Sequence, residues 1–134
     1  MLYVDACALF KRYVVEPDSD RANHWLRSDP DWITARHTYV EVRRNLSRVL
    51  SDPAQRGRAL AQFSRDWSRL SVVEIDEITC ISAASIAEST GARTLDALHL
   101  AAAIRAGGTA MTIVTFDHRL AQAARQLGLT AVGP

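Results

Sequence analysis

Four acidic side chains lie in apolar stretches of the sequence, and they are the first candidates for chemistry. They are Asp5 after Leu-Tyr-Val, Glu41 between two valines, Asp96 in the segment 95–104, and Asp117 after Ile-Val-Thr-Phe. A carboxylate near a core is unfavourable unless it is paired, hydrogen-bonded or bound to a metal. The other acids lie in polar or turn-like stretches, or on faces that water solvates. We therefore examine these four as one group.

Several carboxylates side by side need a counter-charge to remain ionised. Hard divalent cations such as Mg²⁺ and Mn²⁺ prefer oxygen ligands and would supply it. One or two such ions can activate water and stabilise an in-line phosphoryl displacement. Thr115, two residues before Asp117, would add a hydroxyl that positions the activated water. An acidic group of this kind would suit a metal-dependent enzyme that cleaves phosphate esters.

Each acid taken alone also has a purely structural explanation. Asp5 or Asp117 would cap the helix that follows it. Glu41 would pair with Arg44 or Arg43 on the same or a neighbouring helix, and Asp96 would interact favourably with a helix dipole. The functional interpretation therefore depends on whether the four acids come together.

The elements that must position these acids alternate between short apolar runs and helical patterns. Strands are predicted at 2–4, 32–34, 72–75, 112–116 and 130–132. Helices are predicted at 6–13, 19–27, 37–50, around 60–67, and at 76–89, 94–106 and 117–126, with Ser19 or Asp20 and Thr94 as possible N-caps. This alternation favours an α/β domain with a short, mainly parallel sheet.

The four acids have matching positions in this pattern. Asp5 and Asp117 each follow the carboxyl end of a predicted strand. Glu41 and Asp96 each lie in the first turn or so of a predicted helix. Ligands of open parallel sheets bind at the carboxyl edge of the strands, so we expect all four acids to converge there.

Length, composition, net charge and cysteine count limit the class of protein. The 134 residues fit a single domain spanning 1–134, with 48% hydrophobic residues and a net charge of +1 that neither demands nor excludes nucleic acid. No apolar run reaches the roughly 18 residues that would span a membrane. Cys7 and Cys80 give neither a disulfide framework nor zinc spacing. We expect a cytoplasmic protein without membrane contact.

Four segments resemble, in order, the motifs of the PIN domain, and in particular those of the VapC toxins of bacterial and archaeal toxin–antitoxin pairs. They are Tyr3 to Leu9, Tyr39 to Val42, Thr94 to Ala101 and Val114 to Asp117. The resemblance covers the whole chain in motif order and length. The run from Leu95 to Ala101 is its most specific part.

The resemblance implies a three-layer α/β/α sandwich and a Mg²⁺- or Mn²⁺-dependent endoribonuclease acting on RNA. It implies an acidic metal site of Asp5, Glu41, Asp96 and Asp117, with one or two ions, and Thr115 as a supporting hydroxyl. It also implies a homodimer that is inhibited by a cognate VapB-like antitoxin.

One position departs from the family pattern, which has Ser or Thr two residues after the first Asp. Here that residue is Cys7, whose thiol is a weaker hydrogen-bond donor. Alternatives therefore stay open: a catalytic Cys7, an aspartyl phosphatase with Asp5 as nucleophile, or a PIN-like module that binds RNA or antitoxin without cutting. A fold-only account, in which the acids merely cap helices, is the fourth.

Basic and aromatic residues supply the remaining candidates. Arg36, His37 and Arg93 flank the predicted sheet edge, where they would either hold RNA phosphates or form exposed ion pairs. His99 is interpreted as a hydrogen-bonded packing residue and His118 as a solvent-facing one. The three tryptophans are interpreted as core or interface residues: Trp25, Trp32 and Trp67.

Overall fold

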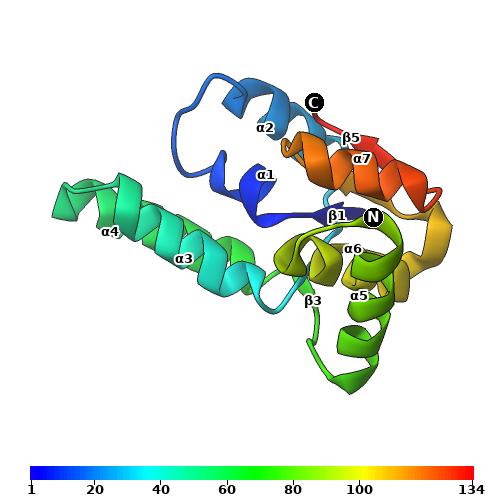
Figure 1. Cartoon of the computed structure of the whole chain (residues 1–134). Coiled ribbons are helices and arrows are strands. Elements are labelled where there is room, and N and C mark those ends of the chain that lie inside the picture. Colours follow the sequence, from blue (N-terminus) through cyan, green and yellow to red (C-terminus); the bar gives the residue numbers. More distant parts are fainter.

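A five-stranded, entirely parallel sheet forms the centre of the computed structural model, which describes residues 1–134 (Figure 1). The strands are β1 (Leu2–Val4), β2 (Trp32–Ala35), β3 (Ser71–Val73), β4 (Thr112–Val114) and β5 (Thr130–Val132). Their order across the sheet is β3-β2-β1-β4-β5. All five predicted strands are present, and the parallel sheet is confirmed.

Seven α-helices and one short 3₁₀ helix connect the strands. They are α1 (Ala6–Phe10), α2 (Ser19–Ser28), α3 (Thr38–Val49), α4 (Pro53–Trp67), α5 (Glu77–Thr90), α6 (Thr94–Gly107), η1 (Gly108–Ala110) and α7 (His118–Gln126). None of the helices has the length and apolar character needed to cross a membrane.

The helices cover both faces of the sheet because successive strand residues point to opposite sides. Tyr3 of β1 and Ile113 of β4 pack with residues of α5, α6 and α7 on one face. Leu2 and Val4 pack with residues of α1, α2, α3 and α4 on the other. Two separate cores on the two faces of one sheet make the three-layer α/β/α sandwich that was expected.

The order of the strands creates a reversal point beside β1. The chain runs from β1 to β2 and β3 on one side, then returns to place β4 on the other side of β1. Ligand sites of open α/β sheets lie at such reversal points, outside the carboxyl ends of the strands. Asp5 directly follows β1, and Thr115 directly follows β4.

Some local predictions were wrong in detail. Helix α6 begins at Thr94, so the N-cap position is Arg93, which makes no side-chain capping bond. The N-cap position of α2 is Asp18, because the Ser19 hydroxyl is held by the turn before the helix, where it donates to the Val14 carbonyl at 3.0 Å. The first helix also ends at Phe10, three residues early.

The three tryptophans pack against the hydrophobic core, as predicted. Trp25, Trp32 and Trp67 are half-buried and pack against the core on the α1–α4 face. The Trp32 indole donates to the carbonyl of Leu26 at 2.9 Å. The three tryptophans are therefore packing residues.

Candidate active site

A buried threonine hydroxyl joins two of the acids at the reversal point. The Thr115 hydroxyl donates to one carboxylate oxygen of Asp5, and it accepts a hydrogen bond from the Asp117 backbone N–H at 3.0 Å. Thr115 is fully buried and Asp5 almost so. Adjacent pairing of β1 with β4 makes this possible, since Val4 lies opposite Val114 and the two strands end together.

Both aspartates also cap helices, as their sequence positions predicted. The other oxygen of Asp5 accepts from the Ala8 N–H of α1 at 2.7 Å. Asp117 accepts from the N–H groups of Arg119 and Leu120 at 2.8 and 3.1 Å, at the start of α7. Each cap fixes the direction of a carboxylate, so capping positions these acids without excluding a further role for them.

Glu41 reaches the same edge from α3, in contact with two histidines. One of its carboxylate oxygens lies 2.9 Å from Nε2 of His99 and 3.5 Å from Nε2 of His37. His99 is buried, and its Nδ1 lies 2.8 Å from the Tyr3 hydroxyl. His99 is buried and hydrogen-bonded, as predicted, and one of its partners is one of the four acids.

Asp96 lies in the first turn of α6, half-buried. Burial raises its pKa, the negative charge of Asp117 raises it further, and His99 and Arg93 oppose the rise. Glu41 also acts on Asp96, and on Asp5. Asp5 and Asp96 thus each feel the charge of other members of the group, which fits four acids that lie near one edge of the sheet.

The electrostatics at Asp5 are those of a buried carboxylate whose charge is only partly compensated inside the protein. Burial raises the pKa of Asp5 to about 6, although His99 and the Thr115 hydroxyl both favour its ionised form. A buried carboxylate beside other acids is stabilised when a positive charge joins them. The oxygen-rich donor set suits a hard divalent ion.

The raised pKa of Asp5 predicts a pH-dependent stability in metal-free protein. Because the folded state holds the Asp5 proton up to about pH 6, and the unfolded chain loses it near pH 4, the stabilisation is complete below about pH 4 and is lost as pH rises to about 6. The expected loss is on the order of 2–3 kcal/mol. Urea unfolding in chelator between pH 4 and pH 7 measures it.

Comparison with Asp5→Asn isolates this effect from other titrations. His37 works in the opposite direction, because burial and His99 lower its pKa to about 4. Asp52→Asn is the matched control, since Asp52 caps α4 through the same backbone contact at an exposed position. If wild type and Asp5→Asn keep a constant difference in stability across this range, the pKa shift at Asp5 is wrong.

Cys7 does not have the environment of a nucleophile. Its half-buried thiol lies near the Asp5 carboxylate, and burial followed by that charge raises the pKa of Cys7 to about 12. The thiol therefore stays protonated at neutral pH, whereas reactive cysteines have a lowered pKa. The catalytic-cysteine alternative loses its physical basis.

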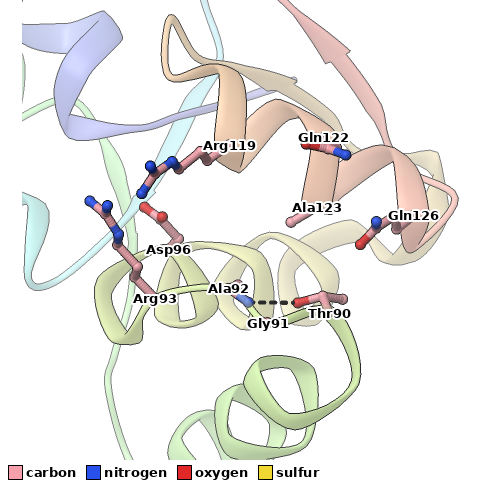
Figure 2. A pocket seen from close by; sticks show the side chains of 9 residues that line it. All are labelled: Thr90, Gly91, Ala92, Arg93, Asp96, Arg119, Gln122, Ala123 and Gln126. Carbon is pink, nitrogen blue, oxygen red and sulfur yellow. Dashed lines mark hydrogen bonds between the residues drawn. The ribbon is translucent and has the colours of Figure 1, made fainter.

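A cavity of about 300 Å³ opens beside Asp96, between the start of α6 and α7. Figure 2 shows Arg93 and Arg119 on either side of the Asp96 carboxylate, with Gln122 and Gln126 lining the α7 side. Neither arginine forms a salt bridge with a carboxylate. Their cations are therefore available to a phosphate.

The two arginines predicted to bind phosphate therefore have different environments. Arg93 borders the cavity, whereas the guanidinium of Arg36 is engaged by Glu74 in an exposed ion pair, which was the alternative considered for it. His118 is exposed, as expected. Arg119 was not predicted, although its place two residues after Asp117, on the helix that Asp117 caps, was a usable signal.

Comparisons with known proteins agree with this architecture. Residues 2–126 match the family model of the PIN domain. The chain is 36% identical to the ribonuclease VapC35 of Mycobacterium tuberculosis, over all of this chain and 97% of the relative. Two solved structures share the fold, each over 98% of this chain and 96% of theirs: FitAcB of Neisseria gonorrhoeae (19% identity, TM-score 0.73) and a toxin–antitoxin complex of Klebsiella pneumoniae (14%, 0.71). This chain therefore belongs to the PIN-domain family, among the VapC-type ribonuclease toxins.

Proposed function

We propose that this chain is a divalent-metal-dependent endoribonuclease, the toxin of a VapBC-type pair, acting through one nuclease domain that spans residues 1–134. The observation that carries the proposal is the convergence of Asp5, Glu41, Asp96 and Asp117 at the reversal point of the sheet. Similarity to a protein named as a ribonuclease supports the substrate class.

The four carboxylates are the proposed ligands of Mg²⁺ or Mn²⁺, as one or two ions. Their oxygens fit such ions, and the raised pKa values of Asp5 and Asp96 fit acids that await a counter-charge. When bound, the cation would supply the Lewis acidity that activates water and stabilises charge on the phosphate.

In this proposal the chain's own residues orient the acids and bind the phosphates of the RNA. Thr115 fixes the orientation of Asp5 by its hydrogen bond and holds the backbone of Asp117. Arg93 and Arg119, beside Asp96, would bind the phosphates of the RNA on either side of the scissile bond (Figure 2). Arg36 would also bind phosphate only if its ion pair with Glu74 were broken. Breaking an exposed ion pair costs little free energy.

A protein partner is part of the proposal. One structural neighbour is a toxin–antitoxin complex. By analogy we expect a cognate VapB-like antitoxin that reaches the sheet edge where the four acids lie, together with a homodimer of this chain. RNA and antitoxin would both be met in the cytoplasm, where we expect the protein to act.

The decisive experiment is cleavage of total cellular RNA by purified, antitoxin-free protein, with Mg²⁺, with Mn²⁺ and with chelator. We expect discrete fragments carrying 5′-phosphate ends in either metal, and none with chelator. Sequencing of the new ends would then identify the cleaved RNA and the cut position.

The binding-module alternative predicts a different outcome. RNA would be retained in a mobility-shift assay but remain uncut in both metals, and Cys7 would then be the first residue to change, to Ser. Fragments that persist in chelator would contradict the metal-dependent mechanism and point instead to a contaminating nuclease.

A further inference from the structure

Two histidines and one acid form a compact group whose chemistry differs from that of the four carboxylates. One ligand atom from each of His37, Glu41 and His99 lies within 4.8 Å of the others. His37 and Glu41 are four residues apart on the same face at the start of α3, and His99 comes from α6. Imidazole nitrogens suit transition metals, whereas Mg²⁺ prefers oxygen.

The imidazole of His37 makes no hydrogen bond of good geometry inside the protein, although the nearby backbone of Leu95 acts to raise its pKa. Both of its ring nitrogens are buried, and neither makes a hydrogen bond. The contact of His37 with Glu41, at 3.5 Å, does not have hydrogen-bond geometry. Buried nitrogens without a partner are rare and call for an explanation, for which a bound ion is one.

The spacing of the ligand atoms fits a tetrahedral ion. Zinc bonds to His and Glu of about 2.0–2.1 Å place neighbouring ligands roughly 3.3 Å apart in a tetrahedron. The two nitrogen-to-oxygen separations, 2.9 Å for His99 and 3.5 Å for His37, lie on either side of that value. The third separation, between the two imidazole nitrogens, is no more than 4.8 Å, and a bound zinc ion would set it to roughly 3.3 Å.

Tyr3 holds the orientation of His99 in the way that metal-ligating histidines require. The Tyr3 hydroxyl lies 2.8 Å from Nδ1 of His99 and Glu41 lies 2.9 Å from Nε2, so in metal-free protein Nε2–H donates to Glu41 and Nδ1 accepts from Tyr3. With an ion bound, Nδ1–H would instead donate to the Tyr3 hydroxyl and the Nε2 lone pair would face the ion. Such partners of the second ring nitrogen fix the tautomer and raise the basicity of the ligand. Tyr3 itself is fully buried in β1 and cannot move away.

We propose that His37, Glu41 and His99 form a binding site for a first-row transition-metal ion of the Zn²⁺ type, with water in the fourth position. Two histidines and one glutamate are an established zinc ligand set. Glu41 also belongs to the acidic group, so Zn²⁺ and Mg²⁺ compete for it. The zinc site itself does not depend on the proposed nuclease activity; only the consequence of competition does.

The test is a calorimetric titration of metal-free protein with Zn²⁺, and with Co²⁺ followed by its visible absorption. Wild type is expected to bind one Zn²⁺ and to give the intense Co²⁺ bands of a tetrahedral site. His37→Ala should weaken Zn²⁺ binding by at least about 10- to 100-fold, the loss typical even for an outer partner of a metal ligand. His24→Ala is the matched control, since His24 is exposed on α2, and it should bind like wild type.

Three results would overturn the site. They are the absence of Zn²⁺ binding by wild type, binding by His37→Ala as tight as that of wild type, and loss of binding in Cys80→Ala, which would assign the ion to that exposed thiol. His37→Phe serves if the alanine variant fails to fold, because it fills the space without a nitrogen. Since the readout is metal binding and not cleavage, failure here leaves the proposed function untouched.

Discussion

Replacing Asp96 with Asn is expected to lower the rate of RNA cleavage by about 1000-fold at saturating Mg²⁺. Loss of one preorganised electrostatic group costs factors of this size in other enzymes, and here it also removes a proposed metal ligand. The measurement is single-turnover cleavage of a labelled RNA that the wild type cuts.

The fold should survive this substitution. Burial and Asp117 already raise the pKa of Asp96, so a neutral amide relieves repulsion, while the lost interaction with the helix dipole is worth only about 0.3–1 kcal/mol. In chelator, the Tm of Asp96→Asn should therefore equal or exceed that of wild type, and the increase in Tm that Mg²⁺ produces should be smaller.

Asp20→Asn is the matched control for Asp96. Asp20 lies in the first turn of α2 and is exposed, so its replacement tests the loss of an acid from a helix start alone. It should cleave RNA at the wild-type rate. Full activity of Asp96→Asn would remove Asp96 from the site and leave the purely structural explanation of its position.

Replacing Thr115 with Val is expected to weaken Mg²⁺ binding and cleavage by about 10- to 100-fold, the range for partners that orient metal ligands. Valine keeps the shape but removes the hydroxyl, so an oxygen of Asp5 and the N–H of Asp117 lose their partner. Each buried group left unsatisfied costs about 1–3 kcal/mol. Metal titrations and unfolding curves measure the two effects separately.

Rescue distinguishes a positioning role from simple loss of stability. Thr115→Ser retains the hydroxyl and should recover most of the metal affinity. Thr34→Val is the matched control: Thr34 is equally buried at the end of β2, but its hydroxyl donates to the Val4 carbonyl. It should lose stability while keeping metal affinity. Equal metal affinity in Thr115→Val and wild type would show that this hydroxyl does not orient the acids.

The elements of the fold were predictable because their signals are local. The run Leu2-Tyr3-Val4 favours a strand by its own composition, and Asp76 and Gly91 lie at the two ends of α5 as cap residues do. Predictions of individual cap residues were wrong where a tertiary contact competed with a local preference. The Ser19 hydroxyl caps no helix because the preceding turn holds it.

Apolar residues recur at helical spacing along α3 and its C-cap Leu50, but this amphipathic pattern is only partly informative about burial. Val42, Leu46 and Leu50 are buried as their spacing suggested, whereas Tyr39 and Val49 at the same helical spacing are 37% and 47% exposed. Periodicity identifies the apolar side of a helix, but the width of the buried stripe depends on what packs against it.

The sequence by itself identified which acids lie in apolar surroundings, and hence predicted Asp5, Glu41, Asp96 and Asp117 as one candidate group. It also determined the α/β alternation, because strand and helix patterns repeat over a few residues. Only the tertiary structure decided the partners: Thr115 for Asp5, His99 for Glu41, and Glu74 for Arg36. Thr115 and Asp5 are 110 residues apart, and they meet because β4 pairs with β1. Strand order is set by packing over the whole chain, so no local pattern could specify these contacts.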